Sequence, residues 1–349
     1  MGKTDQIKVG ISVGDPNGIG GEIILKAFED SRMLELYTPI LYGSTKLLSY
    51  YIKTFNLKTK IHGITSIDQI VPGKLNVMRL FKEPFRVKWG EVSSDAGELA
   101  VKSFQTATAA LKNSEIDVLV TAPIHKESIQ SDDFKFPGHT DYLNQELEGE
   151  SLMFMVSDNL RIGLLTDHVP ISEVPKNITA KLIKTKIGTI KDSLKKDFGI
   201  VKPKIAVLGI NPHVGDNGVI GTDDQDTLIP ALEDLRKDGT LIFGPYAADT
   251  FFGNKNHENF DAVLASYHDQ GLVPFKTITF GSGVNYTAGL SHVRTSPDHG
   301  TGFDIAGKGL ADPSSFIEAI HKAVAIFKSR SSYDQLAADP LKNLSRKRR

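Results

Sequence analysis

Short apolar runs rich in β-branched residues alternate along this chain with longer segments whose apolar positions recur at helical spacing. The short runs predict buried strands over residues 7–13, 38–43, 116–124, 202–210 and 261–267. The longer segments predict helices over residues 18–30, 96–113, 177–199, 222–239 and 312–329. Such alternation is typical of an α/β fold with a mostly parallel sheet.

Length and composition are those of an ordinary globular protein. The 349 residues exceed what one hydrophobic core usually fills, which favours two domains, and the polar stretch 129–139 is the candidate crossover between them. The charged content is 24% and the net charge is −1. This balance gives no general attraction to nucleic acid or to an anionic membrane, so we expect neither as a partner.

The absence of cysteine excludes several kinds of chemistry, and the first residues and the apolar runs indicate the cellular compartment. The sequence has no cysteine, which excludes disulfides, thiolate catalysis and cysteine-based zinc sites. The first residues lack the apolar region of a signal peptide, and no apolar run is long enough to cross a bilayer. We therefore expect a cytoplasmic protein, and we expect the basic stretch 341–349 to be a disordered tail.

A histidine follows three of the apolar segments, each time in a polar turn. These are His168, His213 and His268. Ligands of open α/β sheets bind outside the carboxyl ends of the strands, so three imidazoles could meet there and hold a divalent cation. The neighbouring Asp167 and Asp269 could orient the rings. A histidine at a strand end is also often a hydrogen-bonded structural residue, and the pattern leaves both interpretations open.

Other polar residues are candidates for holding an anion. His139 and Thr140 precede a helix in "PGHTDYLNQEL", where Thr140 could cap the helix or the backbone could bind an anion. Lys276, Asn285 and Arg294 are donors spaced along the chain, and arginine suits a planar carboxylate or phosphate. Because exposed Lys and Arg are usually solvated, spacing alone does not assign them.

The glycine-rich stretch "GDPNGIGGE" (14–22) opens a helix after the first strand. It matches neither the G-x-G-x-x-G fingerprint nor the Walker pattern. We therefore interpret it as a strand-to-helix turn and not as a phosphate loop.

Seven motifs in order give the chain a family resemblance. They are "GDPNGIGGE", "PIHKE…FPGHTDYL", "DHVPI", "INPHVGDNG", "GPYAADTFF", "YHDQGLVPFK" and "VNYTAGLSHVRTSPDHGTGFDIAGKG". Together they resemble the 4-hydroxythreonine-4-phosphate dehydrogenase family of pyridoxal phosphate biosynthesis. "DHGTGFDIAGKGLADP" also resembles the loop with which isocitrate and isopropylmalate dehydrogenases hold the adenosine end of the nicotinamide cofactor.

The resemblance implies a fold and an assembly. The fold would be two α/β/α domains with a cleft between them, as in the isocitrate and isopropylmalate dehydrogenases. Residues 1–130, completed by helices within 305–340, would form the first domain, and residues 131–304 the second, which holds the metal and substrate site. The protein would be a homodimer whose metal site is shared across the interface, with His268 supplied by the partner subunit.

The resemblance also implies roles for individual residues. The ligands of a divalent metal (Zn, Mg, Co or Mn) would be His168, His213 and His268. The substrate would be held by His139, Thr140, Lys276, Asn285 and Arg294. The candidates for the catalytic base are Asp249, Asp269 and a metal-bound water, and the residues that would hold NAD or NADP are His299, Gly300 and Asp304.

The implied reaction is the metal-dependent oxidation of 4-phosphohydroxy-L-threonine by NAD, followed by loss of carbon dioxide. The first motif departs from the family, in which Glu and Ala often stand where this chain has Asp15 and Asn17. Such departures leave other substrates open, such as threonate or erythronate 4-phosphate. A metal-dependent hydrolase and a non-catalytic binder of a phosphorylated ligand are the alternatives from other classes.

Overall fold

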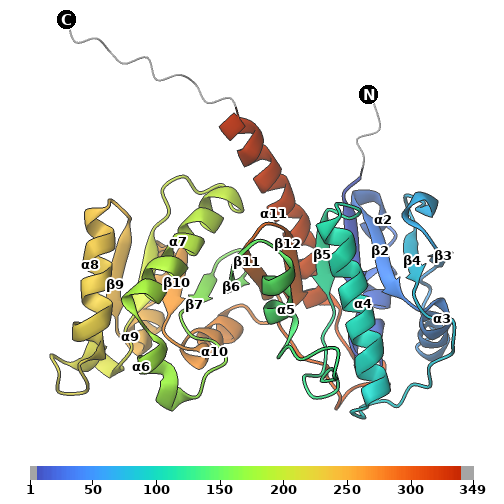
Figure 1. Cartoon of the computed structure of the whole chain (residues 1–349), viewed down its shortest axis with the longest axis horizontal. Helices are drawn as coiled ribbons and strands as arrows, with labels where there is room; N and C mark the ends of the chain where they lie inside the picture. Colours follow the sequence, from blue (N-terminus) through green and yellow to red (C-terminus); the bar gives the residue numbers. More distant parts are fainter. Residues whose placement is uncertain (1–5, 339–349) are drawn as a thin grey trace, which may run out of the picture.

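The computed structural model describes residues 6–338, which form an α/β fold around one large sheet (Figure 1). The strands are β1 (Lys8–Ser12), β2 (Thr38–Gly43), β3 (Ile61–Ile64), β4 (Leu75–Arg79), β5 (Val118–Thr121), β6 (Gly149–Val156), β7 (Arg161–Leu164), β8 (Ile205–Leu208), β9 (Ile242–Tyr246), β10 (Ala262–Ala265), β11 (Val284–Leu290) and β12 (Val293–Pro297). The α-helices are α1 (Gly20–Ala27), α2 (Met33–Leu36), α3 (Thr45–Thr54), α4 (Ser94–Lys112), α5 (His139–Glu146), α6 (Val174–Asn177), α7 (Ala180–Lys196), α8 (Ile229–Lys237), α9 (Ala248–Gly253), α10 (His268–Ile278) and α11 (Ser314–Ala338).

The sheet has twelve strands in the order β3-β4-β2-β1-β5-β12-β11-β6-β7-β10-β8-β9. We call the six strands from β3 to β12 the first half of the sheet and the six from β11 to β9 the second half. Neighbouring strands are parallel throughout the described chain except at β12–β11, β11–β6 and β6–β7, so the predicted mostly parallel sheet is confirmed. The three antiparallel pairs lie in the middle, where the two halves join.

The predicted strands and helices are all present, with one helix divided. The segment 222–239 contains a π-helical turn at Asp224–Leu228 followed by α8. Asp224 is fully buried there, and its carboxylate accepts hydrogen bonds from the backbone N–H groups of Ile210 (2.8 Å) and Asn211 (2.9 Å). The π-helical turn is therefore bound to the segment that follows β8, through the carboxylate of its first residue, Asp224.

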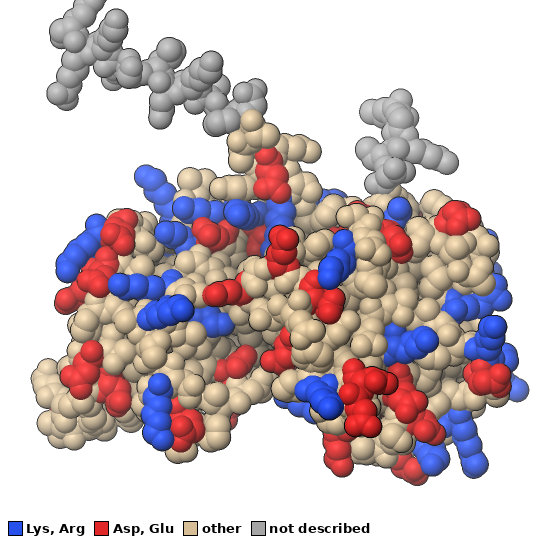
Figure 2. Space-filling view, in the orientation of Figure 1, with Lys and Arg blue, Asp and Glu red and all other residues tan. Residues whose placement is uncertain are grey.

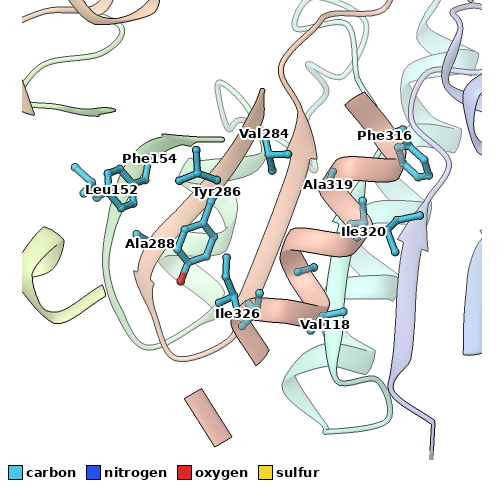
Figure 3. Close-up of a cluster of buried hydrophobic side chains, with 14 of the residues drawn as sticks. Val118, Leu152, Phe154, Val284, Tyr286, Ala288, Phe316, Ala319, Ile320 and Ile326 are labelled. Atoms are coloured by element: carbon cyan, nitrogen blue, oxygen red, sulfur yellow. The ribbon is translucent and has the colours of Figure 1, made fainter. Parts of the chain in front are cut away.

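The helix α11 packs on the middle of the sheet, between the two ends of the molecule (Figure 1). Its apolar side chains Phe316, Ala319 and Ile320 are buried with residues of the central strands such as Tyr286 (Figure 3). The hydroxyl of Thr295 on β12 also donates to the carbonyl of Ala319 (2.7 Å). The last helix is therefore part of the core. At its start, the Asp312 carboxylate accepts a hydrogen bond from the Ser314 N–H (2.9 Å).

A buried ion pair ties the far end of α11 to the second half of the sheet. Arg330 pairs with Asp197, which directly follows α7 and is 2% exposed (2.5 Å). The Tyr286 hydroxyl donates to the same carboxylate (2.7 Å), and Arg330 donates to the Leu290 carbonyl (3.0 Å). We call the group formed by Arg330, Asp197 and Tyr286 the α11 clamp. Since α11 packs on β12 and β5 as well, it joins both halves.

The sheet runs without interruption through the predicted domain boundary. β12 lies within residues 131–304 and pairs with β5, which lies within residues 1–130, with Arg294 opposite Leu119. The division into two domains stays a prediction, and the predicted tail 341–349 lies outside the described residues.

The described surface and helices add two further observations. Basic and acidic side chains are interspersed over the face in Figure 2, in line with the net charge of −1. Within residues 6–338, no helix has both the length and the apolar character that crossing a membrane requires.

Candidate functional site

The central strands present polar residues on one face and apolar residues on the other. On β11, Asn285 and Thr287 alternate with the buried Tyr286, and the pairing places Asn285 opposite Ser296 of β12. Since side chains of a strand point alternately to the two faces, Asn285 and Thr287 share the face opposite to Tyr286 and α11. Arg294, two residues before Ser296 on β12, lies on the same face as Thr287 and bonds to it.

A cavity of about 300 Å³ lies on this polar face, between the two halves of the sheet. Its floor includes Asn285, Arg294 and Ser296 from the central strands. The residues that were predicted from the sequence and that line it are His139, Thr140, Asp167, His168, His268, Lys276, Asn285, Arg294, His299 and Gly300. Ten of the predicted site residues therefore gather around one cavity.

Arg294 is buried without a carboxylate partner in the described chain. It is 2% exposed, and its guanidinium donates to the hydroxyls of Thr121 (Nε, 3.1 Å) and Thr287 (Nη1, 3.1 Å). A second contact joins Nη2 to the Thr121 hydroxyl. Burial lowers the pKa of Arg294 to about 9, because its charge has lost water and gained only neutral hydroxyls. An anion in the cavity would supply the missing countercharge.

His139 lies at the first turn of α5, above Arg294. Burial and the positive charge of Arg294 lower the pKa of His139 well below its usual value, so the ring is neutral at pH 7. Its edge packs on Phe104 at 4.5 Å between ring centroids. The Nε2 atom is buried and has no hydrogen-bond partner among residues 6–338. A buried nitrogen of this kind is suited to a ligand group.

His168 and His268 lie side by side at the ends of two paired strands. Leu164 of β7 is opposite Ala265 of β10, and the two histidine rings that follow are 6.0 Å apart between centroids. The Asp269 carboxylate is 2.7 Å from Nδ1 of His268. Burial lowers the pKa of His168, and Lys126 acts in the same direction. A lowered pKa at His168 and a carboxylate that orients the ring of His268 are both features of histidines that bind metals.

His213, the third predicted ligand, does not line the cavity formed by its own chain. It is exposed, and both His213 (φ +52°) and Val214 (φ +58°) have left-handed backbone conformations that turn the chain after β8. Within residues 6–338, the structure forms no cluster of three or more His, Cys, Asp or Glu side chains able to hold a metal. One chain thus brings together two of the three predicted ligands.

The remaining predicted residues divide into those at the cavity and those outside it. His299 and Gly300 line it, and the buried Nε2 of His299 has no partner in the described chain. Asp304 and Asp249 are exposed and do not line it. Asp269 is exposed too, and it reaches the cavity through its contact with His268.

Three charged cavity residues were not predicted from the sequence as members of the site. They are Lys126 after β5, Asp141 in the first turn of α5 and Asp298 directly after β12. The backbone carbonyl of Asp298 accepts from Nζ of Lys276 (2.7 Å), which holds that ammonium at the cavity. Lys126 stands in the quoted motif "PIHKE" directly after a predicted strand, so its position was the signal that could have identified it.

Known proteins resemble this chain over nearly its whole length. A 4-hydroxythreonine-4-phosphate dehydrogenase of Bacteroides thetaiotaomicron is 43% identical over 340 residues, which cover 97% of this chain and 93% of that protein. A D-threonate 4-phosphate dehydrogenase of Cupriavidus necator is 35% identical, covering 93% of this chain and 98% of the relative.

Solved structures share the fold. The 4-hydroxythreonine-4-phosphate dehydrogenase of Klebsiella pneumoniae superposes with a TM-score of 0.79 at 31% identity, covering 93% of this chain and all of that chain (100%). An isocitrate dehydrogenase of Methylococcus capsulatus matches with a TM-score of 0.51 at 11% identity, covering 95% of this chain and 89% of the other, which is a likeness of fold alone. The expected fold class is confirmed.

The family follows from the whole-length comparison. The sequence model of the family described as "Pyridoxal phosphate biosynthetic protein PdxA" matches residues 35–323, which is most of the chain. That range contains the cavity and every residue predicted to line it. Together with the 43% identity to a curated relative, this match shows that the chain belongs to the PdxA family.

Proposed function

We propose that this protein is a nicotinamide-dependent and divalent-metal-dependent dehydrogenase of a small phosphorylated hydroxy acid, with 4-phosphohydroxy-L-threonine as the first candidate. The observation that carries the proposal is the buried guanidinium of Arg294, which faces the cavity with Lys276 and Lys126. A buried cation without a carboxylate is stabilised by an anionic ligand, and the guanidinium fork matches phosphate or carboxylate. The names of the relatives supply the type of reaction, the oxidation of an alcohol.

The charges of the cavity suggest how the substrate lies. Its phosphate and carboxylate would face Arg294, Lys276 and Lys126, while Asn285 and the neutral His139 would hydrogen-bond to it. Oxidation at the hydroxyl carbon gives 2-amino-3-oxo-4-phosphooxybutanoate, a β-keto acid. Loss of carbon dioxide then gives 3-amino-2-oxopropyl phosphate. Neither Asp249 nor Asp269 lines the cavity, but Asp269 contacts His268, which does, so Asp269 is the better candidate of these two residues for the base.

The reaction needs a divalent metal and a nicotinamide cofactor. The pair His168 and His268 fits the metal, and the loop that begins at His299 fits the cofactor. Asp269 is bonded to Nδ1 of His268, which leaves the Nε2 of that ring as a ligand for Zn, Mg, Co or Mn. A cation there supplies Lewis acidity toward the substrate hydroxyl. The unpartnered Nε2 of His299 fits a polar group of NAD or NADP beside the loop, and the nicotinamide supplies the hydride acceptor.

We propose a homodimer that completes the metal site. His168 and His268 already lie 6.0 Å apart between ring centroids in one chain, whereas His213 is exposed. The third imidazole would therefore come from a second copy as His213. This differs from the assignment implied by the resemblance, in which His268 comes from the partner, and mixed dimers distinguish the two.

The proposed reaction is tested with the purified protein, both nicotinamide cofactors and a series of the four metals. We expect 4-phosphohydroxy-L-threonine to reduce the nicotinamide and to release carbon dioxide. The Arg294→Met variant is the control, since it should lose turnover with little change in unfolding temperature. Release of inorganic phosphate without nicotinamide reduction would refute the proposal in favour of a hydrolase.

The shared site is tested by mixing inactive variants after reversible dissociation. His213→Ala mixed with His268→Ala should recover about one quarter of wild-type activity, because half of the dimers are mixed and each has one intact site of two. His168→Ala mixed with His268→Ala should recover none if both ligands come from one chain. Recovery in that second mixture would instead assign His268 to the partner.

A second candidate substrate is D-threonate 4-phosphate, because the relative from Cupriavidus necator carries that name and covers 93% of this chain. The two substrates differ at the carbon next to the carboxylate, which carries an amino group in one and a hydroxyl in the other. The carboxylates of Asp141, Asp167 and Asp298 at the cavity favour the amino compound. A comparison of kcat/KM for the two compounds decides between them.

A further inference from the structure

The turn between β1 and α1 binds a second segment of the chain through Asn17. The Nδ2 of Asn17 donates to the Glu91 carbonyl (2.8 Å), and its Oδ1 accepts from the Lys88 N–H (2.8 Å). The backbone carbonyl of Asn17 also accepts from the Gly90 N–H (2.9 Å). Asn17 is fully buried, so three bonds from one residue fix the segment 88–91.

This turn does not have the chemistry of a phosphate loop. Asp15 is fully buried in it, and its carboxylate accepts from the Asn17 N–H (2.9 Å) and the Ser128 hydroxyl (3.1 Å). Asp15 thus occupies the Asn17 N–H, a backbone donor that a phosphate loop would offer to its ligand. The expected strand-to-helix turn is confirmed, and the function of its polar residues lies elsewhere.

The segment 88–91 carries the only tryptophan of the sequence, Trp89. The Trp89 ring packs against Tyr51 at 5.2 Å and Phe55 at 5.5 Å between centroids. It also lies directly on Gly307, where an added Cβ would be 2.6 Å from Cγ of Trp89. Gly307 has a φ of +78°, so the loop formed by residues 301–307 passes Trp89 in a conformation that favours glycine.

The same turn also binds the loop directly. The Ile19 N–H donates to the Thr301 carbonyl (2.9 Å), one residue after Gly300. Phe303 stacks on His125 at 5.1 Å, with the ring planes within 11° of parallel. The loop is thus held at Thr301, Phe303 and Gly307, immediately after the two residues that line the cavity.

We propose that Asn17 and Trp89 are positioning residues for the nicotinamide cofactor: they hold the loop 301–307 so that His299 and Gly300 face the cavity. This rests on the proposed function, in which the loop binds the cofactor. Asn17 acts through Trp89, and Trp89 acts through its contact with Gly307. The Asn17→Ala change removes side-chain atoms and introduces none, so the variant is expected to fold without a steric clash.

The first experiment compares Asn17→Ala with Asn76→Ala. Asn76 is a matched control, because it is fully buried and its Nδ2 bonds to the carbonyls of Val71 (3.1 Å) and Lys74 (3.0 Å), away from the loop. Loss of the two side-chain bonds of Asn17 is expected to weaken NADH binding about tenfold by calorimetry. Trp89 emission should shift to longer wavelength without any ligand, and substrate KM should stay within about twofold. Asn76→Ala should leave both NADH affinity and emission unchanged.

A second comparison uses two glycines that share a left-handed backbone. Gly307→Ala and Gly73→Ala both introduce a Cβ at a positive φ (+78° and +76°), but only the first meets Trp89, since Gly73 faces open space. We expect Gly307→Ala alone to shift Trp89 emission and to weaken NADH binding about tenfold or more. An Asn17→Gln variant that regains NADH affinity would support the hydrogen-bonding role.

The outcomes separate this inference from the function on which it rests. If the wild-type protein binds neither NADH nor NADPH, the proposed function is wrong and the inference falls with it. If the wild type binds NADH and Asn17→Ala binds it equally well, the inference alone is wrong. Equal losses in Asn17→Ala and Asn76→Ala would also overturn it, because they would reflect general loosening of the fold.

Discussion

Replacing Arg294 with methionine is expected to abolish substrate binding without destabilising the protein. A guanidinium has five N–H donors. Its contacts with Thr121 and Thr287 use three of them, which leaves two for an anionic oxygen. At about 1.5–3 kcal/mol for each hydrogen bond to a charged group, their loss amounts to about 3–6 kcal/mol. This corresponds to a fall in kcat/KM of about 10²- to 10⁴-fold.

The same substitution should not lower the free energy of unfolding, and it could raise it. The substitution removes a buried cation that has no carboxylate partner within the described chain, and a methionine of similar length fills the space. Replacing buried charges by apolar groups is often neutral or stabilising by about 1–4 kcal/mol. The free energy of unfolding, measured in urea, should therefore stay equal or rise.

The assay combines steady-state kinetics, urea unfolding and a matched control. Arg161→Met is the control, because the Arg161 guanidinium lies over the Phe198 ring (4.8 Å) and does not line the cavity. It should leave substrate KM unchanged, and Arg294→Lys, which keeps the charge, should fall between wild type and methionine. An unchanged KM together with a clear loss of stability in Arg294→Met would refute the reasoning and make Arg294 a structural residue.

Three further predictions concern pH, the α11 clamp and the metal. Because the pKa of His139 is lowered in the folded state, the unfolded state binds more protons below the ordinary histidine pKa of about 6.5. Stability should therefore fall as the pH falls below about 6.5, and urea unfolding of His139→Gln should depend less on pH. Arg330→Met leaves the Asp197 carboxylate buried without its cation, which should lower the free energy of unfolding by about 3–5 kcal/mol in urea; an unchanged midpoint would contradict the clamp. A chelator should remove turnover and lower the unfolding temperature of the wild type, and zinc should restore both, whereas His268→Ala should respond to neither addition.

The strands β1, β2, β5, β8 and β10 could be predicted from the sequence, because they are apolar runs between amphipathic helices. Strands β3, β4 and β9 toward the two edges were not predicted. Nor were β11 and β12, in which one face carries cavity residues such as Asn285 and Arg294 instead of apolar side chains. The helix α10 was also missed, because Gly271 and Pro274 lie inside it and lower its helical propensity. At β11 and β12, residues of the candidate site therefore interrupt the apolar pattern of a buried strand.

The candidate site was predicted in its residues better than in its geometry. Paired strands place His168 and His268 together, as their positions after two apolar runs suggest. The exposure of His213 depends on consecutive left-handed residues after β8, which no residue pattern in "NPHVGDNG" specifies. The anion-binding character of Arg294 depends on which groups surround it, and that depends on strands far apart in the sequence.

The unbroken sheet has a consequence for motion. In many two-domain enzymes a flexible linker lets rigid lobes swing together around a substrate. Here the three residue pairs between β12 and β11 connect the two halves directly, and α11 spans this join on the side opposite the cavity. The two halves are thus joined by the sheet itself, and a change in the width of the cavity would require the central strands to twist or bend.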